Sequence, residues 1–272
     1  MTITTRDQLI AALGNNSSRV VWDKASIANT AAAQVFSLWR ATGVPGQGAI
    51  PAAAALTVNG LLGSMGFTNQ VGPVTSYYAF QTANSSLAFS SFEVHDRLAH
   101  MGGLNGTLLT AQTVGVDLLT LALPAARRGD ANYSDVQWWL EWYTDTGATA
   151  ANATVNVTYD DASTGNLAVI AVGGTVRASR MIGLVSAVPG RFIRGVNNVT
   201  LSASTATAGS FGVTATRPRT TVSTAVANKA ENFDWALLGL PEIPNDSCLM
   251  ILSVCTTTST GTLRGQGKIA HG

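Results

Sequence analysis

The second half of the chain alternates apolar and polar positions in short runs that are separated by glycine-containing turns. Alternation with a period of two is typical of strands that bury one face. The pattern predicts strands at residues 74–80, 107–114, 135–144, 153–159, 167–172, 181–188, 198–203, 211–215, 248–256 and 261–270. Many short strands at regular spacing indicate a mainly β fold, and we expect a β-sandwich of the jelly-roll kind.

The N-terminal part has helical features instead. Thr5-Arg6-Asp7-Gln8 matches a capping box, and Gly14 ends the helix that follows. An apolar stripe predicts a second helix at residues 27–41. Residues 44–70 are rich in glycine, proline and small apolar side chains without a period. Because such a segment is unfavourable free in water, we expect it to lie irregularly over another surface.

One further helix is predicted within the β-rich part. Ser90-Ser91-Phe92-Glu93 forms a second capping box, and Val94, Leu98 and Met101 follow at helical spacing. We therefore divide the chain into an N-terminal helical and extended arm, residues 1–70, and a β-sandwich, residues 71–272, with a short inserted helix at about residues 91–101.

Composition narrows the class of protein. Charged residues make up 11% of the 272 residues and hydrophobic ones 46%. No apolar run reaches the length of about 18 residues that a membrane-spanning helix needs, and the N-terminus has no pattern of a secretory signal. Cys248 and Cys255 fall seven apart on one predicted strand, so their thiols point to opposite faces and cannot bridge. We expect two reduced cysteines and assembly in a reducing compartment.

Charge is unevenly distributed although the net charge is only +1. Residues 162–230 contain no acidic residue, whereas residues 1–161 carry eleven acidic and seven basic ones. The basic residues of the acid-free stretch are Arg177, Arg180, Arg191, Arg194, Arg217, Arg219 and Lys229. The six arginines are candidates for an interface with a negative partner, such as another subunit. Alternatively, they balance the acidic half within the same molecule. The arginines lack interleaved aromatic residues, so we do not expect direct nucleic-acid binding.

Signals of catalysis are weak. The chain shows neither a nucleophile elbow nor a phosphate-binding loop. His95 and His100 are five positions apart and would not share a helical face, which favours a structural role over a metal site. Asp160 and Asp161 fall in a predicted turn. We expect no catalytic residue, no metal, no cofactor and no enzymatic activity.

The aromatic sequence Trp138-Trp139-Leu140-Glu141-Trp142-Tyr143 offers an alternative function. On a strand, the side chains of Trp138, Leu140 and Trp142 share one face, which we expect to be core. Trp139, Glu141 and Tyr143 share the other face. Aromatic rings stack on sugars and carboxylates bind hydroxyls, so this face is a candidate carbohydrate platform, or else a packing surface.

Two segments resemble known virion proteins. Residues 248–270, an apolar strand, a threonine-rich turn and an alternating strand, resemble the last hairpin of viral jelly rolls. Residues 94–107 are similar to segments of tailed-bacteriophage structural proteins. The two segments lie within the roughly one third of the chain that the resemblance covers. The resemblance implies a jelly-roll head decoration (cement) protein that binds the outside of a phage capsid. It also implies a trimer or dimer without catalytic residues.

The low charge, the reduced cysteines and the long apolar segment suit a subunit that is buried among copies. We therefore expect a virion protein that bridges neighbouring shell subunits through many weak contacts, with the major capsid protein or another virion subunit as its partner. In this hypothesis the virion is assembled in the host cytoplasm, and residues 1–70 form the arm that contacts a neighbour. Another virion component (tail, baseplate or major shell subunit) and a carbohydrate-binding β-sandwich remain as alternatives.

Overall fold

The computed structural model describes residues 3–206 and 209–272 and is mainly β, with 43% of residues in strands and 8% in helices. The chain forms two compact units. The first comprises Met1–Ala49, Val58–Asp96 and Pro218–Gly272, and the second Ile50–Thr57 and Arg97–Arg217. Two long strands, β6 (Ser90–Leu104) and β14 (Phe211–Thr224), run from one unit into the other.

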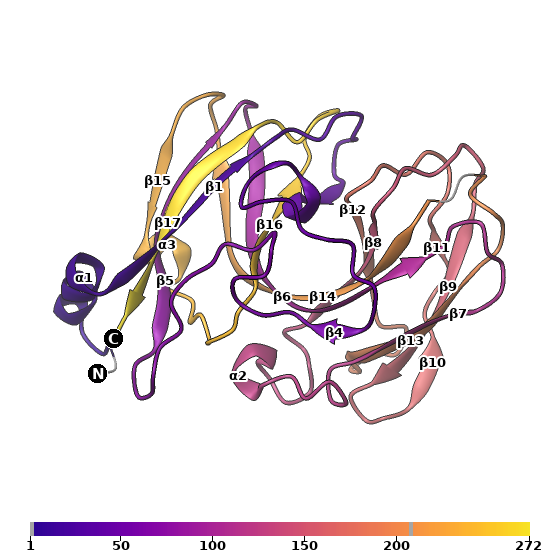
Figure 1. Cartoon of the computed structure of the whole chain (residues 1–272), viewed down its shortest axis with the longest axis horizontal. Helices are drawn as coiled ribbons and strands as arrows, with labels where there is room; N and C mark the ends of the chain where they lie inside the picture. Colours follow the sequence, from indigo (N-terminus) through magenta and orange to yellow (C-terminus); the bar gives the residue numbers. More distant parts are fainter. Residues whose placement is uncertain (1–2, 207–208) are drawn as a thin grey trace. The chain divides into compact units, whose positions relative to one another are not determined.

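The first unit contains a five-stranded sheet with the order β15-β5-β17-β1-β3 (Figure 1). These strands are β15 (Glu231–Asp234), β5 (Ser76–Ser85), β17 (Leu263–His271), β1 (Ser17–Lys24) and β3 (Gly43–Val44). All of their pairings are antiparallel, and β17 pairs along almost its whole length with β5 and with β1. The C-terminal strand is therefore the centre of this sheet.

A second group of strands completes the first unit. β16 (Leu249–Val254) pairs with β2 (Val35–Ser37) and with the first part of β6. Val20 and Trp22 of β1 share one hydrophobic core with Val94 of β6 and Ile251 of β16. The remaining elements of this unit are α1 (Arg6–Asn15), the 3-10 helix η1 (Leu38–Arg40) and α3 (Trp235–Leu238).

The second unit has a five-stranded sheet, in which four strands follow the order β10-β9-β13-β7 and the fifth, β11, pairs with another part of β9. In addition, β8 pairs with β12 and with the first part of β14, while β4 pairs with the last part of β6. The elements are β4 (Ala55–Leu56), β7 (Gln112–Asp117), α2 (Ala125–Arg128), β8 (Gln137–Trp142), β9 (Asn152–Tyr159), β10 (Thr164–Asn166), β11 (Ile170–Ala171), β12 (Arg180–Leu184) and β13 (Ile193–Leu201).

The core of the second unit uses the predicted aromatic face. Trp138, Leu140 and Trp142 of β8 are buried, as their alternation predicts. The rings of Trp142 and Phe211 stack with centroids 4.6 Å apart. Trp138 also donates its indole N–H to the carbonyl of Ile193, 2.8 Å away, so its one polar atom is satisfied in the core.

Several local predictions are confirmed. The Thr5 side chain caps α1 by accepting from the Gln8 N–H, and Gln8 accepts from the Thr5 N–H in return. The strands predicted at residues 135–144, 153–159, 248–256 and 261–270 correspond to β8, β9, β16 and β17. Cys248 directly precedes β16 and Cys255 directly follows it, and both thiols are free and buried.

The helix predicted at residues 27–41 is wrong. This stretch contains a bend, the three-residue strand β2 and the 3-10 helix η1. Asn29 and Ala33 have positive φ angles of 58° and 62°, which interrupt a right-handed helix. The predicted apolar stripe also fails, because the alanines at its start are exposed while Phe36, Ser37, Leu38 and Trp39 are buried in succession.

The helix predicted at residues 91–101 is also wrong, because these residues belong to the fifteen-residue strand β6. Residues 91–96 pair with β16 in an uninterrupted antiparallel register. Val94 and Leu98, four apart, fit the period of a strand as well as that of a helix. From Val94 to His100 every side chain is buried, so both faces of the strand are covered and its polar residues are enclosed.

The predicted arm, residues 1–70, is not a separate body. Residues 50–57 belong to the second unit and the rest to the first. β1 is paired through all eight of its residues with β17, so the N-terminal residues build the same sheet as the C-terminal ones. α1 lies at the end of this sheet, beside the last residues of β17 (Figure 1).

Candidate functional site

Five of the six candidate interface arginines form ion pairs within their own unit. Each contacts an aspartate, and four of the five pairs lie in the second unit. The pairs are Arg177–Asp145, Arg191 with Asp160 and Asp161, Arg194–Asp117, Arg217–Asp135 and, in the first unit, Arg219–Asp96. These five ion pairs are what internal charge balance, the alternative that the sequence left open, requires, and the role of the arginines as a partner interface stays a prediction.

The ion pair of Arg194 and Asp117 has the most hydrogen bonds of the five. Arg194 donates from Nε and from a terminal nitrogen to the Asp117 carboxylate, at 2.9–3.2 Å. β13 and β7, which carry these residues, are neighbouring strands. For Arg180, at the start of β12, the described residues include no carboxylate partner. Burial lowers the pKa of its guanidinium.

The predicted sugar platform is not formed. Glu141 is only 1% exposed and Tyr143 only 4% exposed, so neither presents a surface to a ligand. Trp139 is half-buried and donates its indole N–H to the Thr216 hydroxyl, 2.9 Å away. The alternation along β8 is correct, but the second face of the strand is covered as well as the first.

Glu141 belongs instead to a buried charge cluster in the second unit. Its carboxylate lies 2.7 Å from a terminal nitrogen of Arg97 and accepts a hydrogen bond of 2.6 Å from the Thr214 hydroxyl. Arg97 donates from Nε to Nδ1 of His100, at 3.0 Å. Burial, with the Arg97 guanidinium as the second cause, lowers the pKa of His100 to about 3. His100 is thus a neutral acceptor. Burial raises the pKa of the Tyr143 hydroxyl, which donates to Glu141 at 3.3 Å.

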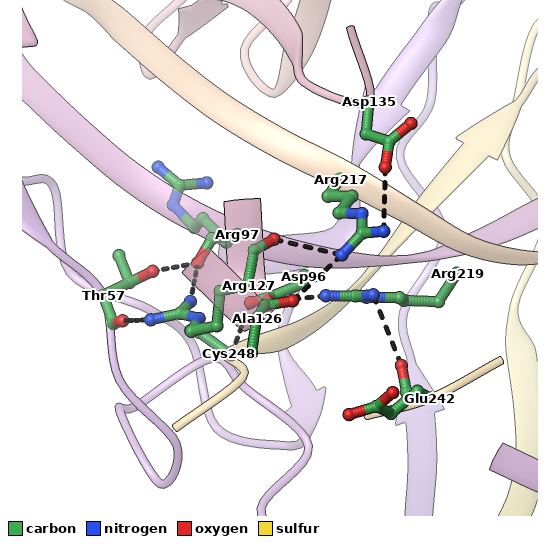
Figure 2. A network of polar contacts seen from close by, with 10 residues as sticks. All are labelled: Thr57, Asp96, Arg97, Ala126, Arg127, Asp135, Arg217, Arg219, Glu242 and Cys248. Carbon is green, nitrogen blue, oxygen red and sulfur yellow. Dashed lines mark hydrogen bonds and ion pairs between the residues drawn. The ribbon is translucent and has the colours of Figure 1, made fainter. Parts of the chain in front are cut away.

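A second buried arginine supports this cluster through backbone groups. Arg127, on α2, donates to the carbonyls of Thr57 and Arg97 at 2.5 and 2.9 Å (Figure 2). The Thr57 hydroxyl donates to the same Arg97 carbonyl. These bonds hold the short segment around β4 against β6, a structural task.

The first unit has its own buried pair, also drawn in Figure 2. Arg219 lies 3.2 Å from Asp96 and donates to the Glu242 carbonyl at 3.3 Å. Asp96 in addition accepts from the Cys248 N–H at 2.8 Å. The carboxylate therefore links β6 to the residue that precedes β16. Its oxygens are occupied by protein donors.

The histidines fit structural roles. His95 is buried, and its Nε2 lies 2.7 Å from the Glu93 carboxylate, whose pKa this hydrogen bond lowers. His271 contacts the hydroxyls of Ser18 and Ser76 through its two ring nitrogens, each at 2.8 Å. Within residues 3–206 and 209–272, no group of three or more His, Cys, Asp or Glu side chains is arranged to hold a metal ion.

The second unit contains a cavity of about 410 Å³ beside Trp139. Its walls are mainly apolar and include Leu184, Val185 and Phe192, with Arg191 at one side. Arg191 is already paired with Asp160 and Asp161. The cavity therefore offers shape and apolar area but no free charged group to orient a polar ligand.

Four of the eleven large apolar side chains that are exposed in the described part of the first unit lie on one loop, residues 58–71, which we call the apolar loop. Val58, Leu61, Leu62 and Val71 are all exposed, Leu62 at 61% and Val71 at 85%. The sequence predicted an irregular apolar segment covering another surface. The loop is irregular, as predicted, but these four side chains face outward.

The apolar loop is anchored by hydrogen bonds. Asn59 donates to the Phe67 carbonyl at 2.6 Å and accepts from the Phe67 N–H at 3.1 Å, which closes the loop on itself. The loop also bonds to β16 and to the segment before it: the Met65 N–H donates to the Leu249 carbonyl of β16 at 2.8 Å, and the Asn69 amide donates to Asp246 at 2.6 Å. These hydrogen bonds therefore hold the backbone that carries the exposed Leu61 and Leu62 in one conformation.

None of the helices in the described part of the chain has the length and hydropathy that a membrane crossing requires. Neither a protein family nor a curated protein matches this chain. Among solved structures, the chain is similar to the infectious bursal disease virus VP2 subviral particle, with 10% identity and a TM-score of 0.17 over 94% of this chain and 79% of that one. A second is the T13 particle of the same virus, with 9% identity and a TM-score of 0.16 over 94% and 76%. Such scores establish neither a common fold nor a common function.

Proposed function

We propose that this chain is a non-enzymatic structural protein of a virion, and specifically a decoration (cement) protein that bridges and stabilises neighbouring capsid subunits. The apolar loop is the observation that carries this proposal. It presents Val58, Leu61, Leu62 and Val71 to solvent on a frame fixed by hydrogen bonds. Exposed apolar side chains on an ordered surface are typical of sites that a partner covers.

The fixed frame makes the apolar loop suited to repeated weak contacts. A loop that is already ordered loses little conformational entropy when it binds, so more of the contact energy remains as affinity. Many copies on one shell would add such contacts together. The proposed partner is the major capsid protein or another virion subunit, and the proposed location is the outside of the particle.

The buried ionisable residues support a structural rather than an enzymatic role. Arg97, Glu141, Arg127 and Asp96 are almost fully enclosed and bond to one another or to backbone groups. In this proposal they specify the fold instead of meeting a substrate. The finer fold that we propose is a jelly-roll β-sandwich, which is consistent with the hydrophobic core shared by the two groups of strands in the first unit.

The proposal is tested by binding to capsid shells of the virus that encodes this chain, prepared without the chain. We expect the purified wild-type chain to co-sediment with the shells and to raise the temperature at which they rupture. The variant Leu62→Glu places a charge in the contact and should lower the bound fraction at least tenfold, since burying an unpaired carboxylate is strongly unfavourable. Leu237→Glu is the matched control, because Leu237 is a similarly exposed leucine of the same unit, on α3.

The folded state of both variants is checked by circular dichroism, and we expect little change because both leucines are exposed. Absence of co-sedimentation of the wild type would refute the decoration role. Equal loss of binding in Leu62→Glu and Leu237→Glu would refute the assignment of the contact to the apolar loop.

A further inference from the structure

Two positive side chains lie opposite each other on the exposed face of the five-stranded sheet. Arg19 of β1 is in register with Lys268 of β17, and both side chains are exposed. Directly opposite residues of neighbouring antiparallel strands point to the same face, with Cβ atoms about 4.5–5.5 Å apart. We call Arg19 and Lys268 the basic pair.

The hydrogen bonds between the two strands make the basic pair a close one. The His271 N–H of β17 donates to the Asn16 carbonyl at 2.9 Å, and the bonding direction alternates along an antiparallel strand. Even-numbered residues of β1 therefore bond to β17, and Arg19 and Lys268 form a non-hydrogen-bonded pair. In such pairs the opposite side chains lie closest, and like charges there are destabilising.

The basic pair is not neutralised within the chain. Across residues 3–206 and 209–272, neither Arg19 nor Lys268 forms an ion pair with a carboxylate. The Lys268 ammonium donates to the Leu13 carbonyl near the end of α1, at 3.4 Å, which is a long hydrogen bond. The repulsion between the two cations therefore remains in the free chain.

The same two strands pair opposite charges elsewhere. Asp23 of β1 is in register with Arg264 of β17, and these side chains contact each other at 3.1 Å. The sheet therefore compensates one cross-strand cation and leaves the basic pair uncompensated. Because an anion between the two cations would remove their repulsion, this position favours a negatively charged partner.

The apolar loop passes the same part of β1. The Thr68 N–H of the loop donates to the Ser18 hydroxyl at 3.1 Å. Ser18 and Arg19 are neighbours in the chain, and their side chains point to opposite faces of the strand. The apolar loop and the basic pair therefore lie on the two sides of one strand, close enough for one partner surface to contact both.

We propose that Arg19 and Lys268 together bind a carboxylate of the capsid subunit that covers the apolar loop. This inference rests on the proposed function and adds the chemistry of the partner, which carries an acidic side chain beside its apolar contact. A carboxylate has two acceptor oxygens, so it can accept from both cations at once. Charge complementarity of this kind mainly determines the choice of partner and the rate of association.

A nucleic acid fits this face less well than an acidic protein surface. Nucleic acids bind through several phosphates along their backbone, so they need several cations in succession. Next to the basic pair the two strands carry the uncharged Val21 and Gln266. One row further, Asp23 accompanies Arg264, and its carboxylate repels phosphates.

Co-sedimentation with shells prepared without the chain tests the inference. We expect Arg19→Gln/Lys268→Gln to raise the apparent dissociation constant about fivefold or more at low salt, because both charge contacts are lost. Near 1 M salt the effect should fall below about twofold, since charges are then screened over about 3 Å. Arg19→Lys/Lys268→Arg keeps both charges and should bind like the wild type.

The matched control is Arg6→Gln/Lys229→Gln, which removes the same charge from two exposed positions of the same unit. It should leave shell binding unchanged at both salt concentrations. Thermal unfolding verifies the fold, and Arg19→Gln/Lys268→Gln should unfold no earlier than the wild type because a repulsion is removed.

The outcomes separate this inference from the proposed function. A wild-type chain that does not co-sediment refutes the decoration role and this inference with it. Wild-type binding that Arg19→Gln/Lys268→Gln leaves unchanged, or that the control weakens equally, refutes the basic pair alone. A mobility shift of double-stranded DNA that needs Arg19 and Lys268, at the chain concentration that saturates the shells, overturns the choice of an acidic protein.

Discussion

Arg97 and Glu141 illustrate how single residues determine the interior of the second unit. Each is buried, and each has the other as its compensating charge at 2.7 Å. The alternation along β8 correctly predicts that Glu141 and Tyr143 share a face. It does not predict burial, because what covers that face comes from a distant part of the chain, including Thr214 of β14. A candidate sugar platform and a buried charge cluster are therefore indistinguishable at the residue scale.

Removing one partner of the pair should be costly. Glu141→Gln leaves the Arg97 guanidinium buried without a counter-charge, and we expect the free energy of unfolding to fall by about 3–5 kcal/mol. The double variant Arg97→Met/Glu141→Leu removes both charges and should be clearly more stable than the single one. Urea unfolding followed by tryptophan fluorescence measures both. Equal destabilisation of the two variants would contradict a compensating pair.

At the scale of elements, two capping boxes in the sequence have different outcomes. The one at Thr5 begins α1, a short helix that packs Leu9 and Ala12 against the end of one sheet and is otherwise exposed. The one at Ser90 lies in β6, which pairs with β16. Local signals predict elements correctly where few long-range contacts compete with them. They fail in β6, where strands distant in sequence supply the pairing and cover both faces.

Close strand packing gives a prediction for one glycine. A Cβ added to Gly212 of β14 would lie 2.0 Å from the Met101 carbonyl oxygen of β6. Gly212→Ala must therefore separate two backbones, and we expect it to destabilise the second unit by about 1–3 kcal/mol. Gly14→Ala is the control, since Gly14 lies in helix α1 with open space around it, and alanine should stabilise by up to about 1 kcal/mol. Thermal unfolding of both variants tests the opposite signs.

At the scale of the whole molecule, five of the seven basic residues of the acid-free stretch pair with aspartates from elsewhere in the chain. The sequence alone shows the imbalance between segments, but only the fold brings Arg194 to Asp117 and Arg219 to Asp96. Segment charge is therefore a poor guide to surface charge in a sheet protein, where neighbouring strands come from distant positions. The sequence shows that residues 58–71 are apolar. The outward orientation of their side chains, however, depends on the hydrogen bonds that join the loop to β16 and to the segment before it.

The pH dependence of stability follows from the few groups whose pKa the fold shifts. His100 has a folded pKa of about 3 against 6.5 for a free histidine, so between these values the unfolded chain binds a proton that the folded chain does not. Stability is therefore complete above pH 6.5 and falls as the pH decreases. Burial also lowers the pKa of His271, which acts in the same direction. From pH 7.5 to pH 5, His100 should cost about 2 kcal/mol.

The variant His100→Asn isolates this contribution, because its amide oxygen can accept from Arg97 Nε but does not titrate. We expect its loss of stability between pH 7.5 and pH 5 to be smaller than that of the wild type by about 2 kcal/mol, measured by urea unfolding at each pH. Above pH 7 the two proteins should show parallel pH dependence. If both lose the same stability toward pH 5, His100 is not held neutral, and its role as acceptor for Arg97 in the buried cluster is wrong.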